Sequence, residues 1–163
     1  MKKSLALSRI ILILIATIII APSCKKDKGD DNSLKAGTIS FKANGELKTY
    51  DVSMFNTFQD GNDYVCYLFA SMGDNEQSFV SLRVTSAHPI AQKSYVNDTG
   101  DDRDILVHET SGKEYTDGDS QNTIINITKI SDDNIQGTFS GTLINDNETI
   151  TVTEGKFNCP KLM

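Results

Sequence analysis

Alternation of apolar and polar side chains is the strongest constraint on the fold of residues 37–163. Residues 39–43 alternate, and the alternation resumes after Asn44-Gly45. Asn-Gly between two alternating runs predicts a β-hairpin, because a type I′ turn needs two positive φ angles. No stretch after residue 35 carries apolar residues at the 3.6-residue spacing of an amphipathic helix. The sequence therefore predicts an all-β domain.

The other predicted strands follow at the short, regular spacing of β-sandwiches and barrels. Residues 63–72 are apolar on both faces, which is typical of a central strand covered on each side. Further strands are predicted at 79–86, 90–96, 105–109, 123–130, 136–144 and 149–159, with a polar loop at 97–104. We expect an antiparallel β-sandwich of about eight strands, with a calycin-like β-barrel as the alternative.

The last predicted strand changes its phase. Ile150 and Val152 have one parity, whereas Phe157 and Cys159 have the other. A strand of period two cannot keep both pairs inside unless one residue is inserted between them. Glu154-Gly155 lies between the two pairs, so the sequence predicts a β-bulge there.

The N-terminal segment reads as a targeting signal and not as part of the domain. Residues 1–9 carry three basic side chains and no acidic one, and residues 10–21 are an almost unbroken apolar run. A basic region, a short apolar region and small residues before a cleavage site are typical of a secretory signal. The run is too short for a membrane-spanning helix, which needs about 20 apolar residues.

The end of that run, Ala21-Pro22-Ser23-Cys24, resembles a bacterial lipobox. The resemblance implies a diacylglyceryl group on the Cys24 thiol and cleavage of residues 1–23. Two or three acyl chains would give stable membrane anchoring. Residues 24–36 are rich in charge and poor in apolar side chains, so we interpret them as the lipidated cysteine and a flexible tether. A single all-β domain would occupy 37–163.

The C-terminal third carries a second resemblance, in the segments 127–130, 137–143 (GTFSGTL) and 150–157 (ITVTEGKF). Together with the lipobox, this block resembles the closing part of small bacteroidete-type lipoproteins of unknown function. The resemblance implies a compact β domain on a lipid anchor. It implies a location in the cell envelope, at the outer membrane, with a periplasmic and a surface-facing position both open. It supplies no catalytic or ligand-binding residue.

Two cysteines, Cys66 and Cys159, remain after Cys24 is assigned to the anchor. Export would place them in an oxidising compartment, where a disulfide could persist and join the last strand to the sheet. Two separate buried thiols are the alternative, because free cysteine packs as a small apolar residue.

Metal-ligating patterns are sparse. His88 and His108 are isolated and match no zinc motif. A weak calcium candidate comprises Asp98, Asp101, Asp102 and Asp104, but no loop has the EF-hand spacing, and Asp, Asn and Gly are ordinary turn residues. We therefore predict no metal and no cofactor.

The formal charge of −6 disfavours a nucleic-acid partner, which would require a basic patch. No serine-hydrolase motif is present, and the chain has no Trp to stack on a sugar ring. An aromatic strip could form from Tyr64, Tyr67, Tyr95 and Tyr115, although Tyr64 and Tyr67 read more naturally as core.

These observations predict a non-enzymatic envelope lipoprotein. Its contacts would be the membrane, through the lipid anchor, and a protein or glycan partner. A calycin-like carrier of a small apolar ligand is the second hypothesis, and an enclosed apolar cavity would favour it. A small hydrolase is the third, since a pair of carboxylates can be brought together by the fold.

Overall fold

The computed structural model describes residues 34–73, 75–97, 100–117, 122–146 and 148–163. The compact unit runs from Leu34 to Met163, and the predicted leader and most of the tether lie outside the described residues. This unit is all-β, as predicted. Its described strands are β1 (Thr38–Ala43), β2 (Glu46–Tyr50), β3 (Val52–Asp60), β4 (Asp63–Met72), β5 (Asn75–Ser86), β6 (Ser94–Tyr95), β7 (Asp101–His108), β8 (Glu114–Thr116), β9 (Ile124–Ile130), β10 (Asn134–Asn145) and β11 (Glu148–Pro160).

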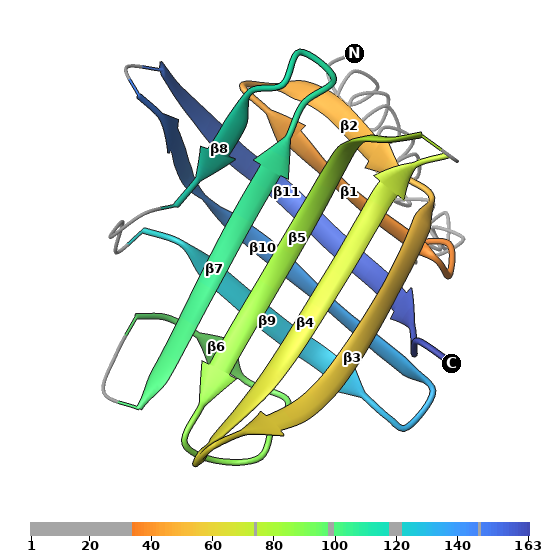
Figure 1. Ribbon diagram of the computed structural model, residues 1–163, viewed down its shortest axis with the longest axis vertical. Coiled ribbons are helices and arrows are strands. Elements are labelled where there is room, and N and C mark those ends of the chain that lie inside the picture. The colour runs from red at the N-terminus through yellow and green to blue at the C-terminus, as the bar shows by residue number, and fades with distance from the viewer. Residues whose placement is uncertain (1–33, 74, 98–99, 118–121, 147) are drawn as a thin grey trace, which may run out of the picture. The chain divides into compact units, whose positions relative to one another are not determined.

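The strands form one antiparallel sheet with the order β2-β1-β11-β10-β8-β7-β5-β4-β3, while β9 pairs with β10 and β6 pairs with β9. Figure 1 shows β3, β4, β5 and β7 as one layer crossing over the layer of β1, β9, β10 and β11. The two ends of the sheet approach each other, since Leu162 donates a backbone hydrogen bond to Phe55 (2.8 Å) and Ser53 donates one to Gly37 (3.2 Å). The result is a nearly closed barrel, consistent with either predicted β architecture.

The barrel interior is filled by side chains. One continuous core includes the rings of Phe41, Tyr50, Phe55 and Tyr95, all at most 2% exposed. Phe41 stacks on Tyr50 with ring centroids 5.8 Å apart. Close packing of this kind is what makes a protein interior sensitive to the loss or gain of a single methyl group.

The predicted β-bulge in β11 is confirmed. Glu154 has a φ of 53°, and the register against both β1 and β10 shifts at this point. The extra residue brings Val152 (1% exposed) and Phe157 (2% exposed) to the same inner face. Gly155 packs against Phe139, and a Cβ atom at this position would overlap the Phe139 carbonyl oxygen and ring.

Other sequence predictions had mixed outcomes. The hairpin turn at Asn44-Gly45 is confirmed, with φ angles of 49° and 86°. The polar loop predicted at 97–104 is wrong in its second half, because β7 begins at Asp101. Sequence patterning missed β3 and β8 altogether, and the strand predicted at 90–96 is reduced to β6.

The prediction that β4 is covered on both faces is wrong for part of its outer face. Cys66 and Leu68 are fully buried on the inner face, but Tyr67 on the outer face is 39% exposed. The layer of β3, β4, β5 and β7 has no further layer of described residues packed on its outside (Figure 1). Val65, on the same outer face, is 2% exposed, so this face is covered near the start of β4 and open at Tyr67.

We predict that Gly155→Ala lowers the free energy of unfolding by about 1–3 kcal/mol, the usual cost of overpacking a core site. Chemical denaturation monitored by circular dichroism would measure the change. Thr153→Ala, at an exposed position one residue before the bulge, is the control and should stay within about 0.5 kcal/mol of wild type. Equal stability of the two variants would contradict the packing described here.

Candidate functional site

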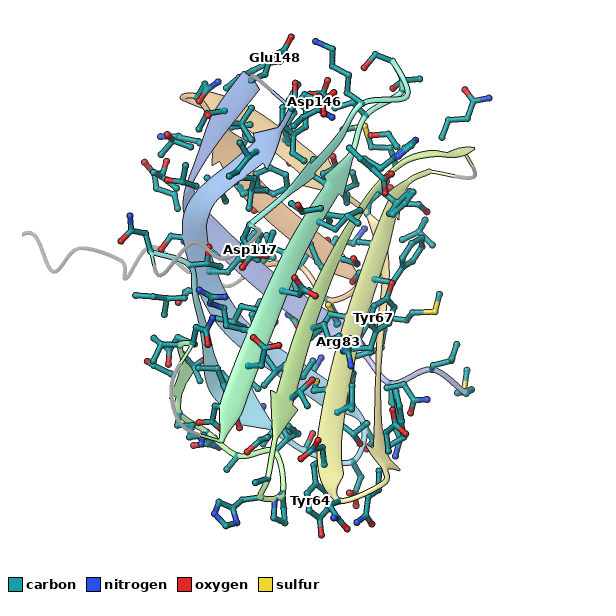
Figure 2. All side chains as sticks on the ribbon, turned by 60° about the vertical axis from the view of Figure 1, so that its left-hand side comes forward. Tyr64, Tyr67, Arg83, Asp117, Asp146 and Glu148 are labelled. Atoms are coloured by element: carbon teal, nitrogen blue, oxygen red, sulfur yellow. The ribbon has the colours of Figure 1, made fainter. Side chains whose placement is uncertain are left out.

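A row of side chains crosses the outer face of the β3–β4–β5–β7 layer. The antiparallel register places Asn56 opposite Tyr67, Tyr67 opposite Arg83, and Arg83 opposite Asp104. We call these four residues the outer row. Alternation along each strand directs them away from the core, and Figure 2 shows Tyr67 and Arg83 on neighbouring strands. With strands about 4.8 Å apart, the row spans about 14 Å.

The outer row is open to solvent. Tyr67 is 39% exposed, Arg83 and Asp104 are exposed, and Asn56 is half-buried. Within the described part of the chain, no ion pair or hydrogen bond engages the Arg83 side chain. Arg83 is also the only lysine or arginine on the outer faces of β3, β4, β5 and β7 among those residues. Its five N–H donors are therefore available to a ligand.

A cluster of rings supports the row on one side. Phe69 lies beside Phe79 with centroids 5.4 Å apart, and Phe79 stacks on His108 at 4.9 Å. All three rings are half-buried. By strand alternation these rings lie on the same outer face as Tyr67, and they pack against one another beside the outer row.

A second polar cluster lies inside the barrel wall. Arg103 points inward from β7 and is 2% exposed, while Asp117, just after β8, is fully buried. The Arg103 guanidinium donates to Asp117 Oδ2 (3.0 Å) and to the Thr123 carbonyl oxygen (2.8 Å). Asp117 Oδ1 accepts a hydrogen bond from the Ile105 amide (3.4 Å). The pair thus joins β7 to the segments after β8 and before β9.

Burial and a hydrogen bond with Asp104 together raise the pKa of Asp117 to about 6, against the lowering effects of the Ile105 amide and of Arg103. Removal of a carboxylate from water favours its neutral form. Because both members of the Arg103–Asp117 pair are enclosed, the pair has no free access to a substrate. Its chemistry is that of a structural clamp between strands.

The weak calcium candidate does not assemble. Asp98 lies outside the described residues. Asp101 pairs with Lys93 (2.6 Å), Asp102 accepts a hydrogen bond from the Arg103 amide (2.8 Å), and Asp104 belongs to the outer row. Among the described residues, no group of three or more His, Cys, Asp or Glu side chains could hold a metal ion.

Cys66 and Cys159 are free thiols, and both are fully buried, so the disulfide considered from the sequence is not formed in this structure. Burial raises the pKa of Cys66 to about 12, with a further contribution from Cys159, and raises that of Cys159 to about 11. Protonated buried thiols are poor nucleophiles. The lipidation site predicted at Cys24 lies outside the described residues.

The predicted aromatic strip is wrong in its membership. Tyr95 is fully buried and Tyr115 is 4% exposed, whereas Tyr67, assigned to the core, lies on the surface. Sequence reasoning also missed Asn56 and Arg83. The available signal was the polar residues of the alternating strand 79–86, but their neighbours across the sheet required the register.

Comparison with known protein-family models, curated proteins and solved structures gave no match to this chain. In the part of the chain that the structure describes, we find no helix with the length and apolar character needed to cross a membrane.

We predict that protonation of Asp117 stabilises the fold. Its folded-state pKa of about 6 exceeds the ordinary value of 3.8, so the native state binds the proton more tightly than the unfolded state. The stability that this proton contributes is present below about pH 4 and is lost as the pH rises through about 6. Urea denaturation between pH 4 and 7 should therefore show a decline that Asp117→Asn reduces. An unchanged pH slope in Asp117→Asn would contradict this assignment, and Asp102→Asn is the matched control.

Proposed function

We propose that this chain is a non-enzymatic, lipid-anchored module of the cell envelope that binds a glycan through the outer row. The observation that carries the proposal is the placement of one exposed aromatic ring, Tyr67, between Asn56 and Arg83 on the outer face of the sheet. A partner chemistry with both an apolar face and many hydroxyl groups fits this arrangement best.

Sugar rings have that chemistry. The C–H bonds on one face of a pyranose pack against an aromatic ring, and the equatorial hydroxyls lie at the edge of the sugar, where planar polar groups can reach them. Asn56 offers both donors and acceptors, Arg83 offers donors, and Asp104 offers acceptors. A row of about 14 Å is longer than one sugar ring, which favours an oligosaccharide or polysaccharide.

Charge favours a neutral glycan over an acidic one. Arg83 is flanked by Asp104, its direct partner on β7, and Asp102 lies on the same outer face of β7. These carboxylates offset the attraction that Arg83 would exert on an anionic ligand. A protein partner is the alternative occupant, and it would need a much larger contact area than the row provides.

The anchor is the second part of the proposal. Cleavage before Cys24 would remove three basic residues and no acidic one, which changes the formal charge from −6 to −9. Anionic headgroups would repel such a domain, so the acyl chains and not the protein surface would hold it at the membrane. The tether would leave the outer row free to meet a glycan.

The two other hypotheses have less support. An apolar carrier would need an enclosed cavity, but the side chains of Phe41, Tyr50 and Phe55 occupy the barrel interior. An apolar pocket of about 340 Å³, which includes Phe58 and Ile90, opens at one end of the barrel instead. A hydrolase would need accessible carboxyl groups in one cleft, whereas Asp117 is enclosed.

We predict that Tyr67→Ala abolishes retardation of the protein in native gels that contain neutral polysaccharides, such as a β-glucan or a mannan. Loss of the stacking ring should weaken binding by about tenfold or more. Tyr64→Ala, on the same strand but at the end of the barrel, should bind as wild type does. Retardation of Tyr67→Ala equal to that of wild type, or no retardation of wild type by any neutral polysaccharide, would refute the glycan proposal.

We also predict that Cys24→Ala abolishes incorporation of radiolabelled palmitate in cells and releases the protein from the membrane fraction. The physical reason is the loss of the only thiol at the end of the apolar run. Cys66→Ala is the control and should be labelled like wild type. Continued labelling of Cys24→Ala would show that the anchor is assigned to the wrong residue.

A further inference from the structure

A small pocket opens at the barrel end formed by the β1–β2 hairpin and the chain after β7. We call it the mouth pocket. Its volume is about 250 Å³, and Phe41, Val107 and Met72 contribute its apolar walls. Drug-sized ligands occupy cavities of about 300–1,000 Å³, so the mouth pocket suits a smaller molecule.

Polar residues occupy inward-facing positions around this pocket. On β2, Lys48 has the same parity as the buried Tyr50, and it lies opposite Phe41 of β1. Ser78 on β5 has the parity of the buried Val80, and Glu109 continues the inward alternation of Arg103, Ile105 and Val107. Most other inward-facing positions are apolar, although Arg103 is a further charged one. Polar residues that break a local pattern of this kind are most often found at functional sites.

The two charged groups have weak partners. Lys48 Nζ contacts Glu46 Oε1 at 3.1 Å, but the Glu46 side chain is 74% exposed, and ion pairs of this type contribute about 0–1 kcal/mol. Glu109 Oε2 accepts a long hydrogen bond of 3.4 Å from Ser111. Within the described residues, no ion pair joins Lys48 to Glu109, although both line the same pocket.

Tyr50 and Ser78 line the same pocket as these two charges. Ser78 Oγ donates to the His108 carbonyl oxygen at 3.2 Å. Burial raises the pKa of Tyr50, while a hydrogen bond with Ser78 and the charge of Lys48 lower it and the charge of Glu109 raises it. A positive group and a negative group therefore both act on one buried hydroxyl, across a pocket with apolar walls.

We infer that the mouth pocket binds a small zwitterion, and that its class is an α-amino acid with an apolar side chain. The carboxylate of the ligand would pair with Lys48, the ammonium group with Glu109, and the side chain would pack on Phe41, Met72 and Val107. A ligand that carries both charges would satisfy two groups that do not reach each other. Charge-assisted contacts of this kind are stronger than neutral hydrogen bonds. This inference is independent of the outer row, which lies on a different surface.

The test uses the full chain in detergent with ¹³C-labelled methionine methyl groups, because Met72 lines the pocket. L-leucine is the probe, with 3-methylbutylamine and 4-methylpentanoate as analogues that each lack one charged group. We expect a saturable shift of the Met72 signal with L-leucine, and Kd values about tenfold higher for each analogue. Met54, on β3, is the internal control and should not move.

Lys48→Met and Glu109→Gln should each raise the Kd for L-leucine by about tenfold. Lys42→Met removes an exposed lysine of β1 that pairs with Glu154 outside the pocket, and it should bind as wild type does. If Lys48→Met fails to fold, the isosteric Glu109→Gln variant decides the question. The absence of a saturable Met72 shift, equal affinity for L-leucine and 4-methylpentanoate, or unchanged binding by Glu109→Gln would overturn the inference.

Discussion

The β-bulge at Glu154-Gly155 is the constraint on which the barrel depends. β11 is paired with β1 on one side and with β10 on the other, so it must present apolar side chains to the core along its whole length. A regular strand of 13 residues with this sequence would turn either Val152 or Phe157 outward. The inserted residue corrects the phase, and Gly155 allows the close approach of Phe139 that the bulge requires.

A continuous core has a functional consequence, because a filled barrel has little room for a ligand inside. The recognition that we propose would then use the ends of the barrel or its outer surface. Both kinds of surface depart from the usual strand pattern: Tyr67 is an exposed ring on a central strand, and Lys48 is a charged residue at an inward-facing position. The buried Arg103–Asp117 pair also breaks the usual strand pattern. Because both side chains are enclosed, the pair can join strands but cannot contact a partner.

Much of the fold could be predicted from local sequence. Asn44-Gly45 specifies its turn, and the change of parity in β11 specifies its bulge, because both signals reside within a few residues. The role of β4 could not be predicted, since burial of its second face depends on whether another layer covers it. The outer row was equally inaccessible, because Asn56, Tyr67 and Arg83 become neighbours only through strand register. The leader and the Cys24 anchor remain predictions from sequence.

The five tyrosines offer the most direct test of a filled barrel that binds glycan on its outer face. Tyr50, Tyr95 and Tyr115 are buried, Tyr64 lies at one end, and Tyr67 lies on the outer face. NMR of the tyrosine ring signals in the full chain, with and without a neutral polysaccharide, would separate these positions. We predict that Tyr67 alone shifts. Shifts of Tyr50 or Tyr95 with Tyr67 unchanged would place the ligand inside the barrel and contradict the account.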